Sequence, residues 1–255
     1  MERTIHLDAP PVVPDWHSAA NYAALLDCDR RSFAWEWLRR SAAYRSAFVN
    51  RGVEPSQFGL VAFVDPVLAA SEAKPIWSPL TDPYVLDSRI AGFRPPPGDQ
   101  FDIRTLAPFV SVEIADEAVE HWLLTNGKWS IRIDLHDGTL LGGPLLLDHR
   151  LQGLSSIEPK LAALKRLVAL TRNGDIPVGL APREVRAARW ILELRTGDAL
   201  AVGASQQDMA RTFFGNSVTP NRWRLDSSSY RLRVQRLVKA ARRHLGAPLA
   251  GPWFN

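Results

Sequence analysis

Cationic side chains gather on one side of the segment 226–245, whose sequence is DSSSYRLRVQRLVKAARRHL. Its apolar residues recur at helical spacing and share one stripe, which predicts an amphipathic helix with its apolar side on a core. Asp226 or Ser227 can take the N-cap position. The opposite side is cationic or polar and is suited to bind phosphate. The stripe consists of Tyr230, Val234, Leu237, Val238, Ala241 and Leu245.

We expect this outward face to contact double-stranded DNA, with roles that depend on position along the helix. The first turns would reach base edges, where Arg suits guanine and Gln suits adenine. These residues are Ser227, Ser228, Arg231, Leu232, Gln235 and Arg236. Other cations would contact phosphates. These are Lys239, Arg242 and Arg243, together with Arg211, Arg222 and Arg224 from the preceding segment. For any single arginine, a solvated surface charge is the alternative.

Three further helices are predicted upstream, and they would position the basic one. They cover residues 156–171, 182–200 and 205–215, and in the last of these Ser205 is a good N-cap with Asp208 three residues later. A helix, a short capped helix and a basic helix outline a helix-turn-helix. The connection 215–226 is longer than the usual three or four residues. A basic amphipathic helix also serves membranes and partner proteins, so both remain alternatives.

The rest of the chain predicts an α+β fold in three segments. Residues 1–50 form a small helical module, in which Ser18 caps one helix and a second helix carries aromatics from Phe33 to Tyr44, which we interpret as core rather than as base-stacking groups. Residues 51–114 are a Pro-rich connector with short strands such as 58–64. Residues 115–255 begin with a three-stranded antiparallel meander and continue into the helical domain. The strands of the meander are expected over 121–125, 128–136 and 139–149, with tight turns at Asn126-Gly127 and Asp137-Gly138.

Charge is distributed unevenly along the 255 residues. Residues 150–255 hold 18 Lys and Arg against 7 Asp and Glu, whereas residues 1–149 hold 13 against 20. This asymmetry favours a polyanion as the partner of the C-terminal part and protein as the partner of the acidic part, although solubility could also produce it. With one cysteine and no apolar run of bilayer length, we expect a cytoplasmic protein without a disulfide.

Neither catalysis nor a metal site is expected. The chain lacks nucleophile-elbow, Walker and HExxH motifs, and its lone Cys28 lies among acidic residues, which raise a thiol pKa. Four residues resemble metal ligands in type, but their spacing matches no recognised site. They are Asp134, His136, Asp137 and His149. We therefore predict a protein that is not an enzyme and has no cofactor.

Two stretches resemble a known family of regulators. The motifs ARWILELRTGD, SQQDMARTFFG, Trp223 and SYRLRVQRLVKAARRHL resemble the helix-turn-helix-variant domain of RovC-like and FseA-like transcriptional regulators. The segment PDWHSAANYAALLDCDRRSFAWEWLRRSAAYR resembles the regulator-like N-terminal module that accompanies it. The resemblance covers about residues 14–50 and 115–247.

This resemblance implies activation of conjugative-element or secretion-system genes by a homo-oligomer on repeated DNA sites. RNA polymerase and a small antiactivator protein are the further partners that it suggests. The rival interpretation is an antiactivator or adaptor that binds another regulator instead of DNA. The cationic outward face favours DNA, because an antiactivator does not need one.

Overall fold

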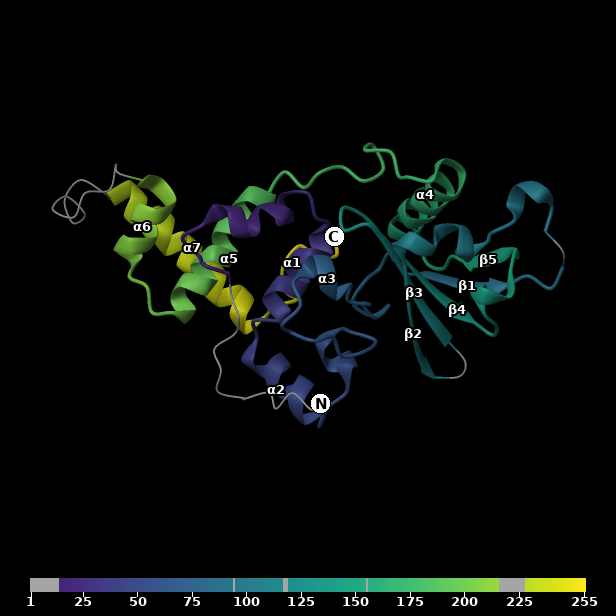
Figure 1. The fold of residues 1–255 in the computed structure, drawn as a ribbon, viewed down its shortest axis with the longest axis horizontal. Helices are drawn as coiled ribbons and strands as arrows, with labels where there is room; N and C mark the ends of the chain where they lie inside the picture. The colour runs from purple at the N-terminus through teal and green to yellow at the C-terminus, as the bar shows by residue number, and fades with distance from the viewer. Residues whose placement is uncertain (1–13, 94, 117–118, 155, 216–227) are drawn as a thin grey trace.

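The computed structural model describes residues 14–93, 95–116, 119–154, 156–215 and 228–255. Figure 1 shows a helical part at one end of the molecule and a β-sheet with one covering helix at the other. Residues from both ends of the chain build the helical part. The middle of the chain builds the sheet.

The helix α5 (Ala187–Ala201) is the centre of the helical part. Residues 193–199 are buried in unbroken succession, because α1 (Arg30–Leu38), α6 (Gln206–Phe214) and α7 (Ser228–Gly246) all pack on this helix. Gly197 permits the closest approach, since a Cβ atom there would lie 3.0 Å from the ring of Trp37. A glycine inside a helix usually costs stability, and here the contact with α1 accounts for it.

The N-terminal module contains one more helical element than predicted. The first helix is η1 (Ala19–Leu26), a 3₁₀-helix in which the Ser18 side chain makes no capping hydrogen bond. The helix predicted from Phe33 to Tyr44 is divided into α1 and α2 (Ala42–Asn50), because the chain turns at Ser41, whose backbone is extended. The prediction of a core role for the aromatics is confirmed: Phe33 and Tyr44 are fully buried.

The sheet has five strands in the order β2-β3-β4-β1-β5. Their bounds are β1 (Leu86–Ile90), β2 (Val110–Asp116), β3 (Val119–Thr125), β4 (Ser130–His136) and β5 (Leu147–Arg150). The β3–β4 hairpin predicted around Asn126-Gly127 is confirmed. The predicted boundary at residues 114 and 115 falls inside β2.

The predicted third strand of the meander is wrong. Residues 139–149 form the 3₁₀-helix η5 (Leu140–Gly142) and then the short β5, which pairs with β1 and not with β4. Strand β1 comes from the Pro-rich segment and lies parallel to β4, between β4 and β5. This insertion depends on a long-range pairing that no local alternation of residues encodes.

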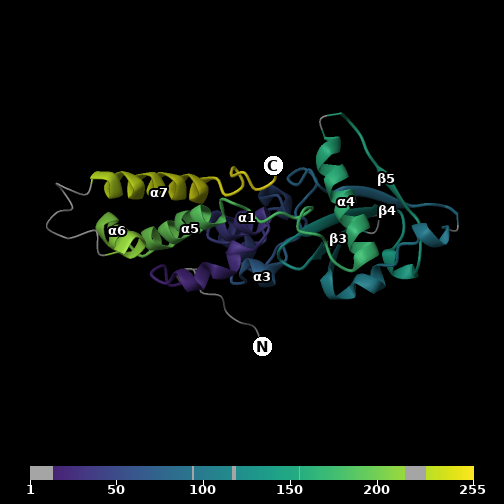
Figure 2. The ribbon, with the colours of Figure 1, turned by 90° about the horizontal axis from the view of Figure 1, so that it is seen from above.

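The connector holds short elements besides β1 and β2. They are η2 (Pro55–Phe58), α3 (Ala70–Ala73), η3 (Pro97–Asp99) and η4 (Ile103–Phe109). The strand expected at 58–64 is wrong, since only an isolated bridge between Leu60 and Trp77 occurs there. The helix α4 (Ile157–Asn173) covers the sheet, as Figure 2 shows from above. Its Leu167 and Leu170 pack in one core cluster with residues of the sheet.

A buried ion network joins α1 to α5. The Arg40 guanidinium donates from Nε and Nη2 to the two carboxylate oxygens of Asp198, at 2.7 and 2.8 Å. Asp198 also accepts from the Tyr22 hydroxyl at 2.6 Å, and Arg39 and Arg40 both donate to Glu36. A buried pair of this kind holds only when every charge keeps its partners.

The carboxylate of Glu36 should contribute to the stability of the protein in a pH-dependent way. Burial alone would raise the pKa of this carboxyl, but Arg40 and Arg39 more than reverse that effect and hold the pKa below its ordinary value of 4.5. Because the folded pKa is depressed, the stabilisation is present above the ordinary pKa and is lost as pH falls through the folded value. Glu36→Gln should cost about 3–5 kcal/mol of unfolding free energy near neutral pH, by leaving two buried arginines without their carboxylate.

Urea unfolding between about pH 3 and pH 7 measures both effects, because the wild type should lose more stability than Glu36→Gln as the solution is acidified. Glu158→Gln, at an exposed position on α4, is the control and should leave both quantities near wild type. Equal stability of Glu36→Gln and wild type near neutral pH would contradict the role assigned to Glu36.

Candidate nucleic-acid interface

The apolar stripe of α7 is buried as the sequence predicts. Val234 and Ala241 are completely buried, and Leu237 and Val238 are nearly so. Val234 and Val238 pack in one cluster with Met209 of α6 and other apolar residues. Trp16 completes this cluster from the N-terminal module. The stripe therefore fixes which side of α7 faces away from the protein.

The opposite side of α7 faces solvent. Figure 2 shows α7 along the outside of the helical part, with α5 and α6 on one side of it. Arg231 is half-buried, and the other described side chains expected at the interface are exposed. The exposed ones on α7 are Leu232, Gln235, Arg236, Lys239, Arg242 and Arg243. Except for Leu232 and Gln235, they are cations on one continuous ridge.

The described acidic side chains do not neutralise this ridge. Arg231, Arg236, Lys239 and Arg242 form no ion pair with any residue that the structure describes. Arg243 donates through Nη2 towards Nε2 of His244 at 3.2 Å, which leaves its charge uncompensated. Solvated cations that lack internal partners are free to neutralise phosphate and release its counterions.

Ser205, at the start of α6, behaves as the sequence predicts. Its hydroxyl accepts a hydrogen bond from the backbone N–H of Asp208 at 3.1 Å, which caps the helix. Arg211 is exposed on α6, 3.9 Å from the carboxylate of Asp208. This separation leaves its guanidinium accessible to a ligand. Ser227, Arg222 and Arg224 lie outside the described residues, and of Ser228 only the helical backbone is described.

A further cation near α7 has no signal in the sequence pattern. Arg45 of α2 and Arg242 of α7 line the same open hollow, of about 530 Å³, between α2, α5 and α7. The Nε atom of Arg45 is buried and has no hydrogen-bond partner in the described chain. Arg40 and Asp198 also line the hollow, but they neutralise each other. Two uncompensated arginines from distant segments therefore face one space.

The residues that resembled metal ligands have other partners. Asp134 accepts from Arg132 and pairs with His121, His136 pairs with Asp87, and His149 bonds the Ser88 hydroxyl. Asp137 adopts a positive φ of 60° before Gly138, as expected for the tight turn. Within the described ranges no group of three His, Cys, Asp or Glu side chains is arranged so that it could hold a metal ion.

Burial and nearby acids both affect Cys28. Burial raises the pKa of this thiol, and the charges of Asp29, Glu36 and Asp27 raise it further, against a lowering contribution from Ser32. The direction agrees with the prediction, although burial is the leading cause and the acidic neighbours come second. A thiol in this state is a weak nucleophile at neutral pH.

Comparison with known families identifies two segments of the chain. Residues 15–55 match the proteobacterial transcriptional regulator-like domain, and residues 151–245 match a RovC domain described as "T6SS, Transcription factor, DNA binding domain". Both are regulatory or DNA-binding families and neither is enzymatic, and the resemblance inferred from the motifs is confirmed. No curated protein matches the chain. None of the helices in the described ranges combines the length and hydropathy needed to cross a bilayer.

Substitutions on the two sides of α7 should differ in how much they change the stability of the protein. Leu237→Ala removes a buried side chain of the stripe and should cost about 2–5 kcal/mol of unfolding free energy. Arg236→Ala removes an exposed side chain without an internal partner and should stay within about 0.5 kcal/mol of wild type. Urea denaturation of the two variants checks this, and a large loss of stability in Arg236→Ala would show that the ridge has a structural role.

Proposed function

We propose that this chain, which carries a proteobacterial transcriptional regulator-like domain and a transcription-factor DNA-binding domain, is a sequence-specific regulator that binds double-stranded DNA through α7. One observation carries the proposal. Within the matched DNA-binding segment, α7 presents a solvent-exposed cationic ridge whose orientation is fixed by a buried stripe on its other side.

The dimensions of α7 suit the major groove. A helix with its side chains is about 10–12 Å across, and the groove is about 12 Å wide. The first turns would approach the bases, where Arg231, Gln235 and Arg236 can donate to base edges and exposed Leu232 can contact a thymine methyl group. Ser227 and Ser228 would begin this set.

Phosphate contacts would flank the base contacts on both sides. Lys239, Arg242 and Arg243 continue the ridge towards the C-terminal end of α7, and Arg211 stands on α6. Arg222 and Arg224 belong to the same proposed set. Arg45 adds a cation from the N-terminal module beside Arg242. Contacts of this kind give affinity and orientation without sequence preference.

The biological role that we propose is activation of secretion-system or conjugative-element genes by a cytoplasmic homo-oligomer. The matched family is described as a T6SS transcription-factor DNA-binding domain, and this description supports secretion-system genes as the targets. RNA polymerase and a small antiactivator are proposed partners of the acidic N-terminal part. We place the helix-turn-helix variant in the C-terminal segment that matches the DNA-binding family.

Arg236→Ala and Lys239→Ala should weaken DNA binding in different ways. Loss of Arg236 should cost about 1–3 kcal/mol on the preferred site and relax the base preference there. Loss of Lys239 should weaken binding to all duplexes alike and reduce the slope of log affinity against log salt by about one unit. Mobility shifts with a selected genomic fragment and a scrambled duplex, over a series of salt concentrations, measure both.

The control is Arg172→Ala, at an exposed position on α4 far along the chain from α7, which should bind as the wild type does. If Arg236→Ala bound both duplexes with wild-type affinity, α7 would lose its role in base recognition. If the wild type itself bound no duplex in a salt-dependent way, the adaptor interpretation would replace the regulator.

Arg45 yields a separate prediction about the N-terminal module. Arg45→Ala should lower the affinity for specific and scrambled duplexes by the same factor and reduce the salt slope by about one unit, because a phosphate contact is lost. Arg89→Ala, at an exposed position on β1, is the control and should leave the slope unchanged. An unchanged slope in Arg45→Ala would confine the interface to the C-terminal domain.

A further inference from the structure

A cavity lies where the helical part meets the sheet part. This junction cavity, of about 380 Å³, is lined by residues of α1, of the β3–β4 turn and of α4, and by residues 181–185 between α4 and α5. Its volume lies in the range of small-molecule sites. The aromatic residues Tyr84, Trp129 and Trp253 contribute to its wall. None of the residues that line the cavity belongs to the ridge of α7, so the proposed DNA interface does not account for it.

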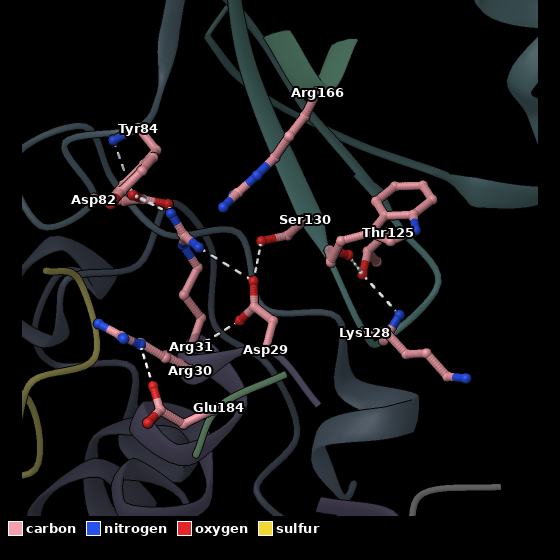
Figure 3. Close-up of polar contacts among 12 residues, drawn as sticks. Asp29, Arg30, Arg31, Asp82, Tyr84, Thr125, Lys128, Ser130, Arg166 and Glu184 are labelled. Carbon is pink, nitrogen blue, oxygen red and sulfur yellow. Dashed lines mark hydrogen bonds and ion pairs between the residues drawn. The ribbon is translucent and has the colours of Figure 1, made fainter. Parts of the chain in front are cut away.

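Most cations that line the junction cavity are neutralised within the protein. Figure 3 shows Arg31 between two carboxylates and Arg30 against Glu184. Burial by itself lowers the pKa of Arg31, but its acidic partners more than reverse this and keep the guanidinium charged. The pairs are Arg31 with Asp82 and Asp29, Arg30 with Glu184, and Arg183 with Asp27. These contacts hold the walls together.

Arg166 of α4 differs from these cations. Its Nε donates to the carbonyl oxygen of Leu180 at 2.8 Å, and its guanidinium lies 5.7 Å from the centre of the Tyr84 ring, but it forms no ion pair with any residue that the structure describes. Figure 3 shows it pointing towards the Arg31–Asp82 pair and Ser130. Its two terminal nitrogens make no hydrogen bond with any described residue, so their N–H groups can donate to a ligand in the cavity.

The surroundings of Arg166 disfavour its charge. Burial lowers the pKa of Arg166, and the positive charge of Arg31 lowers it further. The nearby carboxylates do not compensate fully, because Asp82 is bonded to Arg31 and to the Tyr84 N–H, and Asp29 is bonded to Arg31 and Ser130. A partly buried cation beside a like charge is stabilised when an anion joins it.

Lys128 is the other lining cation without a carboxylate partner in the described chain. It is exposed on the β3–β4 turn, and Figure 3 shows its side chain directed away from Arg166. Arg166 is therefore the lining cation that is best placed to receive an anion. The aromatic side chains around it favour a ligand with a flat, apolar body.

We propose that the junction cavity binds a small organic anion, with its carboxylate or phosphate group on the Arg166 guanidinium and its apolar body against Tyr84, Trp129 and Trp253. Such a ligand touches α1 of the regulator-like domain, α4 of the matched DNA-binding segment and the turn of the sheet at the same time. It also touches the segment 181–185, which leads directly into α5. Binding there would fix the sheet and α4 relative to the helices that carry α7.

The test uses the full-length protein and three small probes that each carry one phenyl ring. Benzoate and phenyl phosphate carry the two candidate anionic groups, and benzamide is the neutral counterpart of benzoate. Isothermal titration calorimetry without DNA should show saturable binding of one or both anions, and at least about tenfold weaker binding of benzamide. Whichever anion binds more tightly identifies the group that the site prefers.

Arg166→Gln keeps a donor for Leu180 and removes the charge, so it should weaken anion binding at least about tenfold. Arg172→Gln, on the same helix but exposed, is the matched control and should bind as wild type. Ala181→Trp fills the cavity while keeping Arg166, and it should also abolish binding. This second variant decides the question if Arg166→Gln fails to fold.

Three results would overturn the proposal: no saturable binding of either anion to the wild type, equal binding of benzamide and benzoate, or binding that persists in both Arg166→Gln and Ala181→Trp. Because the assay contains no DNA, any of these would leave the proposed regulator function untouched. Conversely, failure of the DNA-binding experiments would not contradict the proposed anion site.

Discussion

The bidentate contact between Arg40 and Asp198 is the interaction on which the helical part depends. It joins the segment that follows α1 to the centre of α5, and both side chains are buried, so the desolvation cost of both charges is offset only while Glu36 and Tyr22 also keep their hydrogen bonds. The network permits one relative position of α1 and α5. Since α7 packs its stripe on α5, the orientation of the cationic ridge follows from this position.

A shared hydrophobic core joins the regulator-like segment to α5 and α7 of the DNA-binding segment. Residues 15–55 and 151–245 are far apart in sequence, yet Phe33 and Trp37 share a core cluster with Trp190 and Ala241. The sheet and α4 enclose a separate core. The regulator-like segment therefore belongs to the folding unit that supports α7, and a change in the packing of its core would alter the position of the cationic ridge.

Pairing separates structural cations from candidate ligand-binding cations in this protein. Arg40 and Arg132 are buried and Arg31 is partly buried, and each has a carboxylate partner that stabilises its charge. The ridge cations of α7 are exposed, except for the half-buried Arg231, and lack such partners among the described residues. Arg166 combines partial burial with the absence of a carboxylate partner in the described chain, as Arg45 and Arg231 also do, but of these three it is Arg166 that lines the junction cavity. A cation that a protein buries without an internal anion has surroundings that favour an external one.

The sequence by itself determined the features that depend on neighbours a few residues apart: the cap at Ser205, the stripe and ridge of α7, and the β3–β4 hairpin at its Asn-Gly turn. Helical period, capping and turn chemistry are local properties. Tertiary structure alone decided the insertion of β1 beside β4 and the turn at Ser41. It also decided that Arg45 and Arg242 line the same hollow and that Arg166 lines the junction cavity. Each of these depends on which distant segments come together, and the free energy that selects them comes from burial and charge pairing across the fold.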